Sequence, residues 1–330
     1  MTIIHQIISD AEFEYDPQET RMIIPVRNIR HHPDKVRASE LDSCELKHAY
    51  SKRGVKGIPE VMEQNRSLQH LFKMGEYAAY LIQESLMYKA LRNPHMSFMP
   101  EVDLHNDHMK LAGRADGVLK FNNTEWIVEI KNTEGKTKRS VGDCRYSYAL
   151  QTIAYMLMAG IDNGVIITTS KWKVSTYEVR RQKQILKDQK NASFLIYDEN
   201  DEILDKTWNN IDDLSYQSLM DKVDTRLNVM TDVSDWLVDL LYSEDEVAPP
   251  KRPIEDPFND PNGWQCFWKF DEGRHVRPPL RPAKAIMNCP YADMCYGIKY
   301  GEVIFVTKDK NGNWEIPEKL SEEYEDDGST

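Results

Sequence analysis

The expected fold is decided by one segment, Gly113-Arg-Ala-Asp-Gly-Val-Leu-Lys-Phe-Asn-Asn-Thr-Glu-Trp-Ile-Val-Glu-Ile-Lys131. Two apolar runs flank the polar break Asn122–Thr124, a pattern that predicts a β-hairpin. Because side chains alternate faces along a strand, Glu129 and Lys131 should share one face while Ile130 points into the core. Asp116, at the start of the first strand, should lie close to Glu129 across the pair. The hairpin is therefore expected to gather two carboxylates and an ammonium on one sheet face.

This combination of charges suits phosphodiester hydrolysis. Two carboxylates can hold Mg²⁺ or Mn²⁺ through oxygen, and such a metal lowers the pKa of bound water and shields phosphate charge. A fixed lysine stabilises the charge that develops in the transition state. The alternative is a salt-bridged hairpin without catalytic function, because Glu-x-Lys also occurs at residues 45–47 and 134–136.

The segment resembles a known family at these residues. Gly113-x-x-Asp116 followed by Glu129-Ile130-Lys131 is similar to motifs of the PD-(D/E)xK nucleases, in particular the RecB-like exonucleases. That branch carries Gln-x-x-x-Tyr on the next helix, which Gln151 and Tyr155 match, and residues four apart share a helix face. The resemblance implies that Asp116, Glu129 and the Ile130 carbonyl hold the metal. It also implies that Lys131 stabilises the transition state, and that Gln151 and Tyr155 contact DNA and orient the lysine.

The helix before the hairpin departs from the family pattern. Relatives have Gly-x-x-x-His or Gly-x-x-x-Glu there, which supplies another metal ligand, whereas Gly75 is followed four residues later by Ala79. Glu76 and His70 are the nearest substitutes, and each is also expected as an ordinary surface residue. Glu101 falls where many relatives have an acid near the site.

The cysteines form a second resemblance. Five cysteines in a chain read as cytoplasmic do not predict a disulfide framework. Cys289 and Cys295, with Cys266 upstream, resemble the C-terminal cysteines of iron–sulfur nucleases of the AddB and CRISPR-adaptation type, and Cys44 matches their lone N-terminal cysteine. The resemblance implies a structural 4Fe-4S cluster that ties the chain ends together. Structural Zn²⁺ is an alternative for four thiolates, and Cys144 is expected to be an ordinary buried residue.

Charge and hydropathy limit the function classes. The net charge of −12 argues mildly against nucleic-acid binding, but the basic residues are clustered, and the local field governs phosphate attraction. The cluster that follows Lys131 is best placed to guide DNA, and it comprises Lys136, Lys138, Arg139 and Arg145. No signal peptide and no segment long and apolar enough for a bilayer is evident. The chain is therefore expected to be cytoplasmic, in the host cytoplasm if viral, and not to bind membranes.

The expected organisation is an α/β protein. A restriction-endonuclease-like core, with a mixed central sheet flanked by helices, should carry a C-terminal iron–sulfur lobe closed by the N-terminal cysteine. Helices are expected over residues 39–50, 61–91, 146–158 and 212–242, and strands over 101–104, 109–112, the hairpin, 165–169 and 175–179. The boundaries assign an N-terminal arm to 1–36, the nuclease core to 37–200, an acidic helical segment to 201–245, the cysteine lobe to 246–300 and an acidic tail to 301–330.

The predicted function is metal-dependent DNA cleavage, most consistent with an exonuclease in recombination, repair or phage-type DNA processing. Its substrate would be DNA with a free end or a single strand. No P-loop is present, so unwinding would need a helicase or recombinase partner. Two alternatives stay open: a DNA-binding scaffold whose metal site has decayed at Ala79, and a structure-specific or restriction-type endonuclease.

Overall fold

The computed structural model of the chain comprises two compact units. The first comprises residues 1–42 and 63–227, and the second comprises 43–62 and 228–330. The structure describes residues 4, 6–8, 32–55, 66–132, 146–170, 174–182, 193–204, 214–243, 248–250, 267–270, 283–287, 289, 291, 294–295, 303–308 and 314–315. Within this part of the chain, no helix has the length and apolar character needed to cross a membrane.

The first unit is built on a mixed seven-stranded sheet in the order β1-β3-β4-β5-β6-β7, with β2 also paired to β3. Its strands are β1 (Val36–Arg37), β2 (Met96–Asn106), β3 (Leu111–Phe121), β4 (Thr124–Asn132), β5 (Asn163–Thr169), β6 (Val174–Arg181) and β7 (Phe194–Tyr197). The pairs β1–β3 and β4–β5 are parallel, and the remaining pairs are antiparallel. This confirms the expected mixed central sheet.

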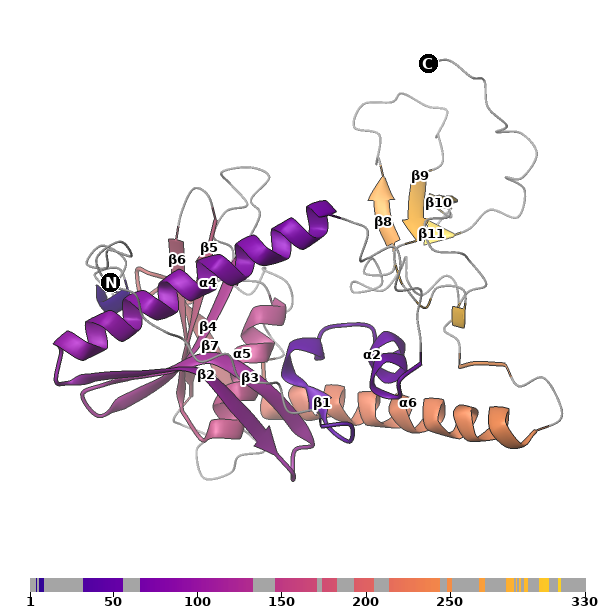
Figure 1. Ribbon diagram of the computed structural model, residues 1–330, viewed down its shortest axis with the longest axis horizontal. Coiled ribbons are helices and arrows are strands. Elements are labelled where there is room, and N and C mark those ends of the chain that lie inside the picture. Colours follow the sequence, from indigo (N-terminus) through magenta and orange to yellow (C-terminus); the bar gives the residue numbers. More distant parts are fainter. Residues whose placement is uncertain are drawn as a thin grey trace, which may run out of the picture. The chain divides into compact units, whose positions relative to one another are not determined.

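Helices cover both faces of this sheet (Figure 1). α5 (Tyr146–Ala159) packs through residues such as Ile153 and Met156 into a cluster that contains Ile127 and Ile166 of the sheet. The first part of α6 (Tyr216–Tyr242) joins the same cluster. α4 (Arg66–Arg92) covers the other face, where Leu86 packs with Val128 and Ile130. Ile130 is thus in the core, as its position in the hairpin predicts.

The β3–β4 hairpin forms as the sequence predicts. Phe121 pairs with Thr124, and Asn122 at the turn has a φ of 54°, a conformation that asparagine tolerates better than most residues. The expected strand at 109–112 is wrong, because β3 runs without a break from Leu111 to Phe121. β2 begins at Met96 and includes Pro100; it pairs only with β3, and an edge strand tolerates a missing backbone donor.

The second unit contains α2 (Glu45–Lys52) and a four-stranded antiparallel sheet. Its strands are β8 (Phe267–Phe270), β9 (Ala283–Met287), β10 (Val303–Lys308) and β11 (Trp314–Glu315). The predicted helix over 39–50 is instead a 3-10 turn, η1 (Ala38–Glu40), followed by α2, for which Cys44 is the extended N-cap. Asp42 and Ser43 separate the two, and these residue types favour turns and caps over helix interiors.

Candidate active site

The site lies where the ladder between β3 and β4 stops. The last paired residues are Gly117 and Val128. Beyond them Asp116 replaces the backbone acceptor with its side chain, because its Oδ2 accepts a hydrogen bond from the Ile130 N–H at 2.6 Å. Further along the same strand, Leu111 and Ala112 pair with β1. On this edge of β3, residues 113–116 lie in a gap between the ladder with β1 and the ladder with β4. Side chains supply the hydrogen bonds that a neighbouring strand would otherwise give there.

Glu129 brings the second carboxylate to this gap. Its side chain is 2% exposed, and Oε1 forms an ion pair with Lys131 Nζ at 2.6 Å. Oε2 is buried and has no hydrogen-bond partner among the residues that the structure describes. Burial raises the pKa of Glu129 even though Lys131 acts in the opposite direction. Burial and the negative charge of Glu129 together raise the pKa of Asp116 well above its usual range. The two acids repel one another, and a cation between them would relieve that repulsion.

Lys131 is held from several sides. Its Nζ donates to Gln151 Oε1 at 3.0 Å and lies 5.6 Å from the centre of the Tyr148 ring. Burial lowers the pKa of Lys131, but the charge and hydrogen bond of Glu129 outweigh it, so the pKa lies above the ordinary value. The lysine is therefore a fixed positive charge, as transition-state stabilisation requires.

Gln151 and Tyr155 complete the cluster from α5. Gln151 Nε2 donates to the Tyr155 hydroxyl at 2.9 Å, which leaves Oε1 for the lysine. The hydroxyl also accepts a hydrogen bond from the backbone of Arg114, while burial raises the pKa of Tyr155 well above its usual range. Gly113 is needed for this fit, because a Cβ there would lie 2.6 Å from Tyr155 Cε1. The structure brings together all five residues predicted as catalytic.

Position 79, where the sequence resemblance led us to expect a further metal ligand, carries an alanine with no side-chain donor. Ala79 packs against the core cluster under α4, and Gly75 faces the Cβ of Asn132. Glu76 on the same helix is exposed. The side chain of His70 lies outside the described residues, and so do Lys136, Lys138, Arg139 and Arg145, the predicted DNA-binding cluster.

Two residues near the site were missed by the sequence analysis. Gln83 on α4 is 2% exposed, and its Nε2 donates both to Glu101 Oε1 and to the Asp116 carbonyl, each at 2.8 Å. Arg114 Nε forms an ion pair with Glu101 Oε2 at 2.7 Å. Gln83 lies one helical turn beyond Ala79 and so on the same face, a spacing that could have drawn attention to it.

The donor set fits a hard divalent cation of the Mg²⁺ type, which needs only one or two protein carboxylates besides water and substrate oxygens. The buried Glu129 oxygen, which has no partner within the described part of the chain, is the observation that favours a ligand. Among the described residues, no group of three or more His, Cys, Asp or Glu side chains is arranged to hold a metal ion. A site here therefore rests on Asp116 and Glu129 as a pair.

Three of the four cysteines predicted as cluster ligands are described. Cys44, Cys289 and Cys295 are buried thiols outside any disulfide, whereas Cys266 and also Cys144 lie outside the described residues. Burial, followed by the charges of Cys295 and Cys44, raises the pKa of Tyr50. Both thiols thus lie close to this tyrosine, which packs against Tyr291 and Trp236 in the second unit.

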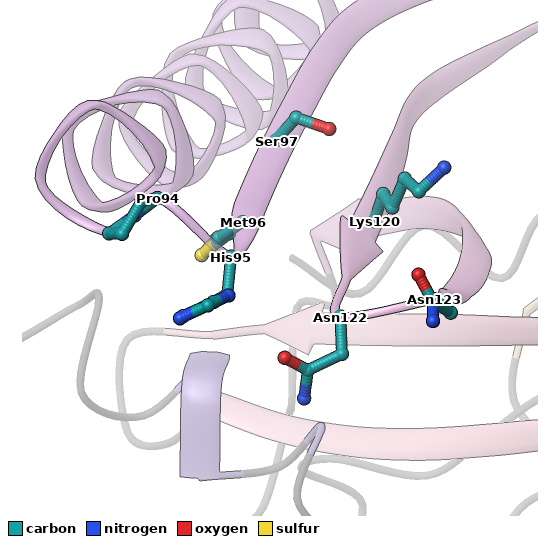
Figure 2. Close-up of a pocket in the computed structure, with 7 residues that line it drawn as sticks. All are labelled: Pro94, His95, Met96, Ser97, Lys120, Asn122 and Asn123. Carbon is teal, nitrogen blue, oxygen red and sulfur yellow. The ribbon is translucent and has the colours of Figure 1, made fainter.

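A polar hollow of about 320 Å³ lies at the other end of the hairpin (Figure 2). It is lined by residues 94–97, Lys120, Asn122 and Asn123. At roughly 3.3 Å per strand residue, Asn122 is about 20 Å along β3 from Asp116. This hollow is separate from the carboxylate site.

Comparisons with known proteins show only remote likeness. No family model and no curated protein matches the chain. Among solved structures, SSO0001 is 14% identical with a TM-score of 0.32, covering 55% of this chain and 78% of its own. The alkaline exonuclease LHK-Exo from Laribacter hongkongensis is 11% identical with a TM-score of 0.31, covering 63% and 91%. Its complex with dAMP is 12% identical with a TM-score of 0.30 over the same shares. Likeness this low carries no argument about activity.

Proposed function

We propose that the chain is a metal-dependent deoxyribonuclease that hydrolyses phosphodiester bonds, acting on DNA with a free end or a single strand. One observation carries the proposal: Glu129 Oε2 is buried without a hydrogen-bond partner among the described residues, beside Asp116 and next to a fixed Lys131. Leaving such an acceptor unsatisfied costs about 1–3 kcal/mol, a cost that ligand binding would offset.

The proposed roles follow from the contacts of each residue. Asp116, Glu129 and the Ile130 carbonyl would hold Mg²⁺ or Mn²⁺, which when bound lowers the pKa of a water and screens phosphate charge. The Ile130 N–H orients Asp116. Lys131 would stabilise negative charge on the attacked phosphate, and Gln151 keeps its ammonium in place. A third side-chain ligand from Glu76 or His70 stays a prediction.

The cellular setting remains a proposal from the family resemblance. It comprises exonucleolytic DNA recombination, repair or phage-type processing, with a helicase or recombinase partner. Lys136, Lys138, Arg139 and Arg145 would guide the strand, since phosphate neutralisation by basic residues dominates nucleic-acid affinity.

The direct test is digestion of end-labelled linear and circular DNA, single- and double-stranded, with Mg²⁺ or Mn²⁺ and with EDTA as control. An exonuclease releases nucleotides from linear substrates and spares circles. Cleavage of circles would favour the restriction-type endonuclease. Absence of metal-dependent cleavage, with DNA binding retained, would favour the decayed scaffold, a rival supported by the absence of a side-chain donor at Ala79.

We further propose that Cys44, Cys266, Cys289 and Cys295 ligate a structural 4Fe-4S cluster, with Zn²⁺ as the alternative. Support comes from the burial of the three described thiols and from the placement of Cys44 in the same compact unit as the C-terminal pair. Because metal binding by thiolates is coupled to folding, variants should lose metal and solubility together.

Purification without oxygen should give brown protein with about four irons per chain, the content of one such cluster. Cys44→Ala should be colourless and poorly soluble, and Cys144→Ala should resemble wild type. A colourless preparation with one zinc per chain would favour structural Zn²⁺ over the iron–sulfur cluster. A fully soluble Cys44→Ala protein with unchanged metal content would contradict both.

A further inference from the structure

Glu101 has an unusual backbone for its position. Four described non-glycine residues have positive φ, and Lys110, Asn122 and Asp201 among them lie outside the strands. Glu101 lies within β2 with a φ of 54°. The β2–β3 ladder pairs the residues on either side, Pro100 with Gly117 and Val102 with Ala115, but does not pair Glu101 with Asp116. A left-handed conformation is strained for an L residue and persists only when its surroundings hold it.

Two side chains hold Glu101 in this conformation. Gln83 donates to Oε1 at 2.8 Å, and Arg114 pairs with Oε2 at 2.7 Å. The same Gln83 amide donates to the Asp116 carbonyl at 2.8 Å. One amide group from α4 thus joins β2 and β3 at the step where their ladder is interrupted.

Glu101 and Glu129 differ in what their oxygens do. Both Glu101 oxygens already accept from fixed donors, whereas Glu129 retains a buried oxygen without a described partner. The described residues also contain no group of three acids arranged as a metal site. Glu129 is thus the carboxylate that keeps an acceptor oxygen without a described partner, and Glu101 is the one whose two oxygens both accept hydrogen bonds.

We propose that Gln83, Glu101 and Arg114 form a positioning clamp for Asp116, and that Glu101 supports the metal site without binding the metal. The proposal rests on the proposed function in so far as Asp116 and Glu129 are the ligands. The clamp fixes the Asp116 backbone, and so fixes where its carboxylate meets Glu129. Gln83 thereby contributes from α4 two hydrogen bonds, one to Glu101 and one to the Asp116 carbonyl.

The test measures Mn²⁺ binding to the full chain by electron paramagnetic resonance. Gln83→Met keeps the length of the side chain but removes the donor, and Glu101→Gln removes the charge that Arg114 pairs with. Each should bind the same number of ions 10- to 100-fold more weakly, as expected for residues that orient ligands. The double variant should bind no more weakly than the weaker single variant, because the two residues act as a unit.

Matched variants separate a clamp from a ligand and from a general packing effect. Ser85→Ala also removes a buried polar group of α4, one that donates to Leu81, and should bind Mn²⁺ like wild type. Glu129→Gln should lose the ion altogether. Arg114→Lys loosens the clamp from the strand side and tests it independently if Gln83→Met does not fold.

Loss of the ion in Glu101→Gln as complete as in Glu129→Gln would make Glu101 a ligand and overturn the proposal. Wild-type affinity in folded Gln83→Met, or in folded Arg114→Lys, would also overturn it. Wild-type protein that binds Mn²⁺, with binding weakened in the clamp variants, but never cleaves DNA would overturn the proposed function and leave the clamp standing.

Discussion

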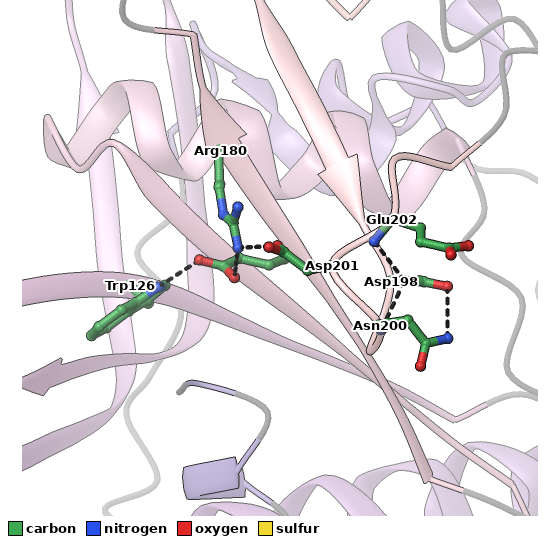
Figure 3. Close-up of polar contacts among 7 residues, drawn as sticks. Trp126, Arg180, Asp198, Asn200, Asp201 and Glu202 are labelled. Carbon is green, nitrogen blue, oxygen red and sulfur yellow. Dashed lines mark hydrogen bonds and ion pairs between the residues drawn. The ribbon is translucent and has the colours of Figure 1, made fainter. Parts of the chain in front are cut away.

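Two buried glutamates of the same sheet have opposite surroundings. Glu178 on β6 is 6% exposed and is paired on both oxygens, by Trp126 Nε1 at 3.5 Å and by Arg180 Nη2 at 2.7 Å. Figure 3 shows how Arg180 continues this network to Asp201. Glu129 on β4 is 2% exposed and has one oxygen without a described partner. Burial alone therefore does not mark a functional acid, whereas a buried acceptor without a partner calls for an explanation such as a bound ligand.

The same contrast appears in the positive charges. Arg180 lies 4.1 Å from the centre of the Tyr197 ring, and its hydrogen bond with Glu178 raises the pKa of the guanidinium. Lys131 bridges Glu129 to Gln151 on a helix that carries further site residues. The Arg180 guanidinium completes a structural network. The Lys131 ammonium instead lies beside the two carboxylates that we propose as metal ligands.

The largest loss of cleavage activity is expected for a substitution at Glu129. Glu129→Gln should lower the rate of DNA cleavage by about 1,000-fold or more, because it removes a metal ligand and the partner of Lys131. Initial rates on end-labelled DNA with Mg²⁺ measure the loss, and circular dichroism checks the fold. A folded variant that cleaves within tenfold of wild type would show that Glu129 is not part of the site.

A smaller loss of cleavage rate is expected for Gln151 and Tyr155, which support Lys131. Gln151→Ala should lower the cleavage rate about 10- to 100-fold and Tyr155→Phe about tenfold, because both loosen the lysine without removing it. Thr152→Ser serves as the control, since Thr152 lies on the same helix α5 but contacts Gly164 of β5 rather than the site. Equal cleavage rates for Gln151→Ala and wild type at saturating Mg²⁺ would show that Gln151 of α5 does not position Lys131 for catalysis.

Glycine substitutions separate local strain from displacement of the site. At Gly113 a Cβ would meet Tyr155 at 2.6 Å, so Gly113→Ala should lower the cleavage rate by about tenfold through that displacement. Gly160→Ala is the matched control, because Gly160 has a φ of 69° and nothing within 4 Å of the added methyl group. It should cost about 1 kcal/mol of stability and leave the rate unchanged. An unchanged cleavage rate in Gly113→Ala together with a lowered rate in Gly160→Ala would contradict the placement of the site beside Gly113.

The smallest change in activity is expected at Glu178. Glu178→Gln should leave the cleavage rate within about twofold of wild type. Urea denaturation should show a free energy of unfolding lower by about 1–3 kcal/mol, because the substitution weakens a buried hydrogen-bonded pair. A large loss of activity in folded Glu178→Gln would mean that the paired network also serves the site.

Local pattern was sufficient for the hairpin and for one helix. The Asn-rich break between two apolar runs predicted the turn at Asn122, and the spacing of Gln151 and Tyr155 predicted their common face. Both depend on neighbours in sequence, so periodicity reveals them. The split of 39–50 into η1 and α2 was missed, because a one-turn interruption is too short to change the pattern.

The sequence by itself determined that Asp116, Glu129 and Lys131 would fall at the start and end of one hairpin, because strand alternation and turn chemistry are local. Only the tertiary structure decided that the ladder stops at Gly117 and that Gln83 reaches the Asp116 carbonyl from α4. It alone also decided that both oxygens of Glu178 have partners, while one oxygen of Glu129 has none among the described residues. These features depend on segments distant in the chain, and hydrogen-bond satisfaction in a buried site is fixed only when those segments meet.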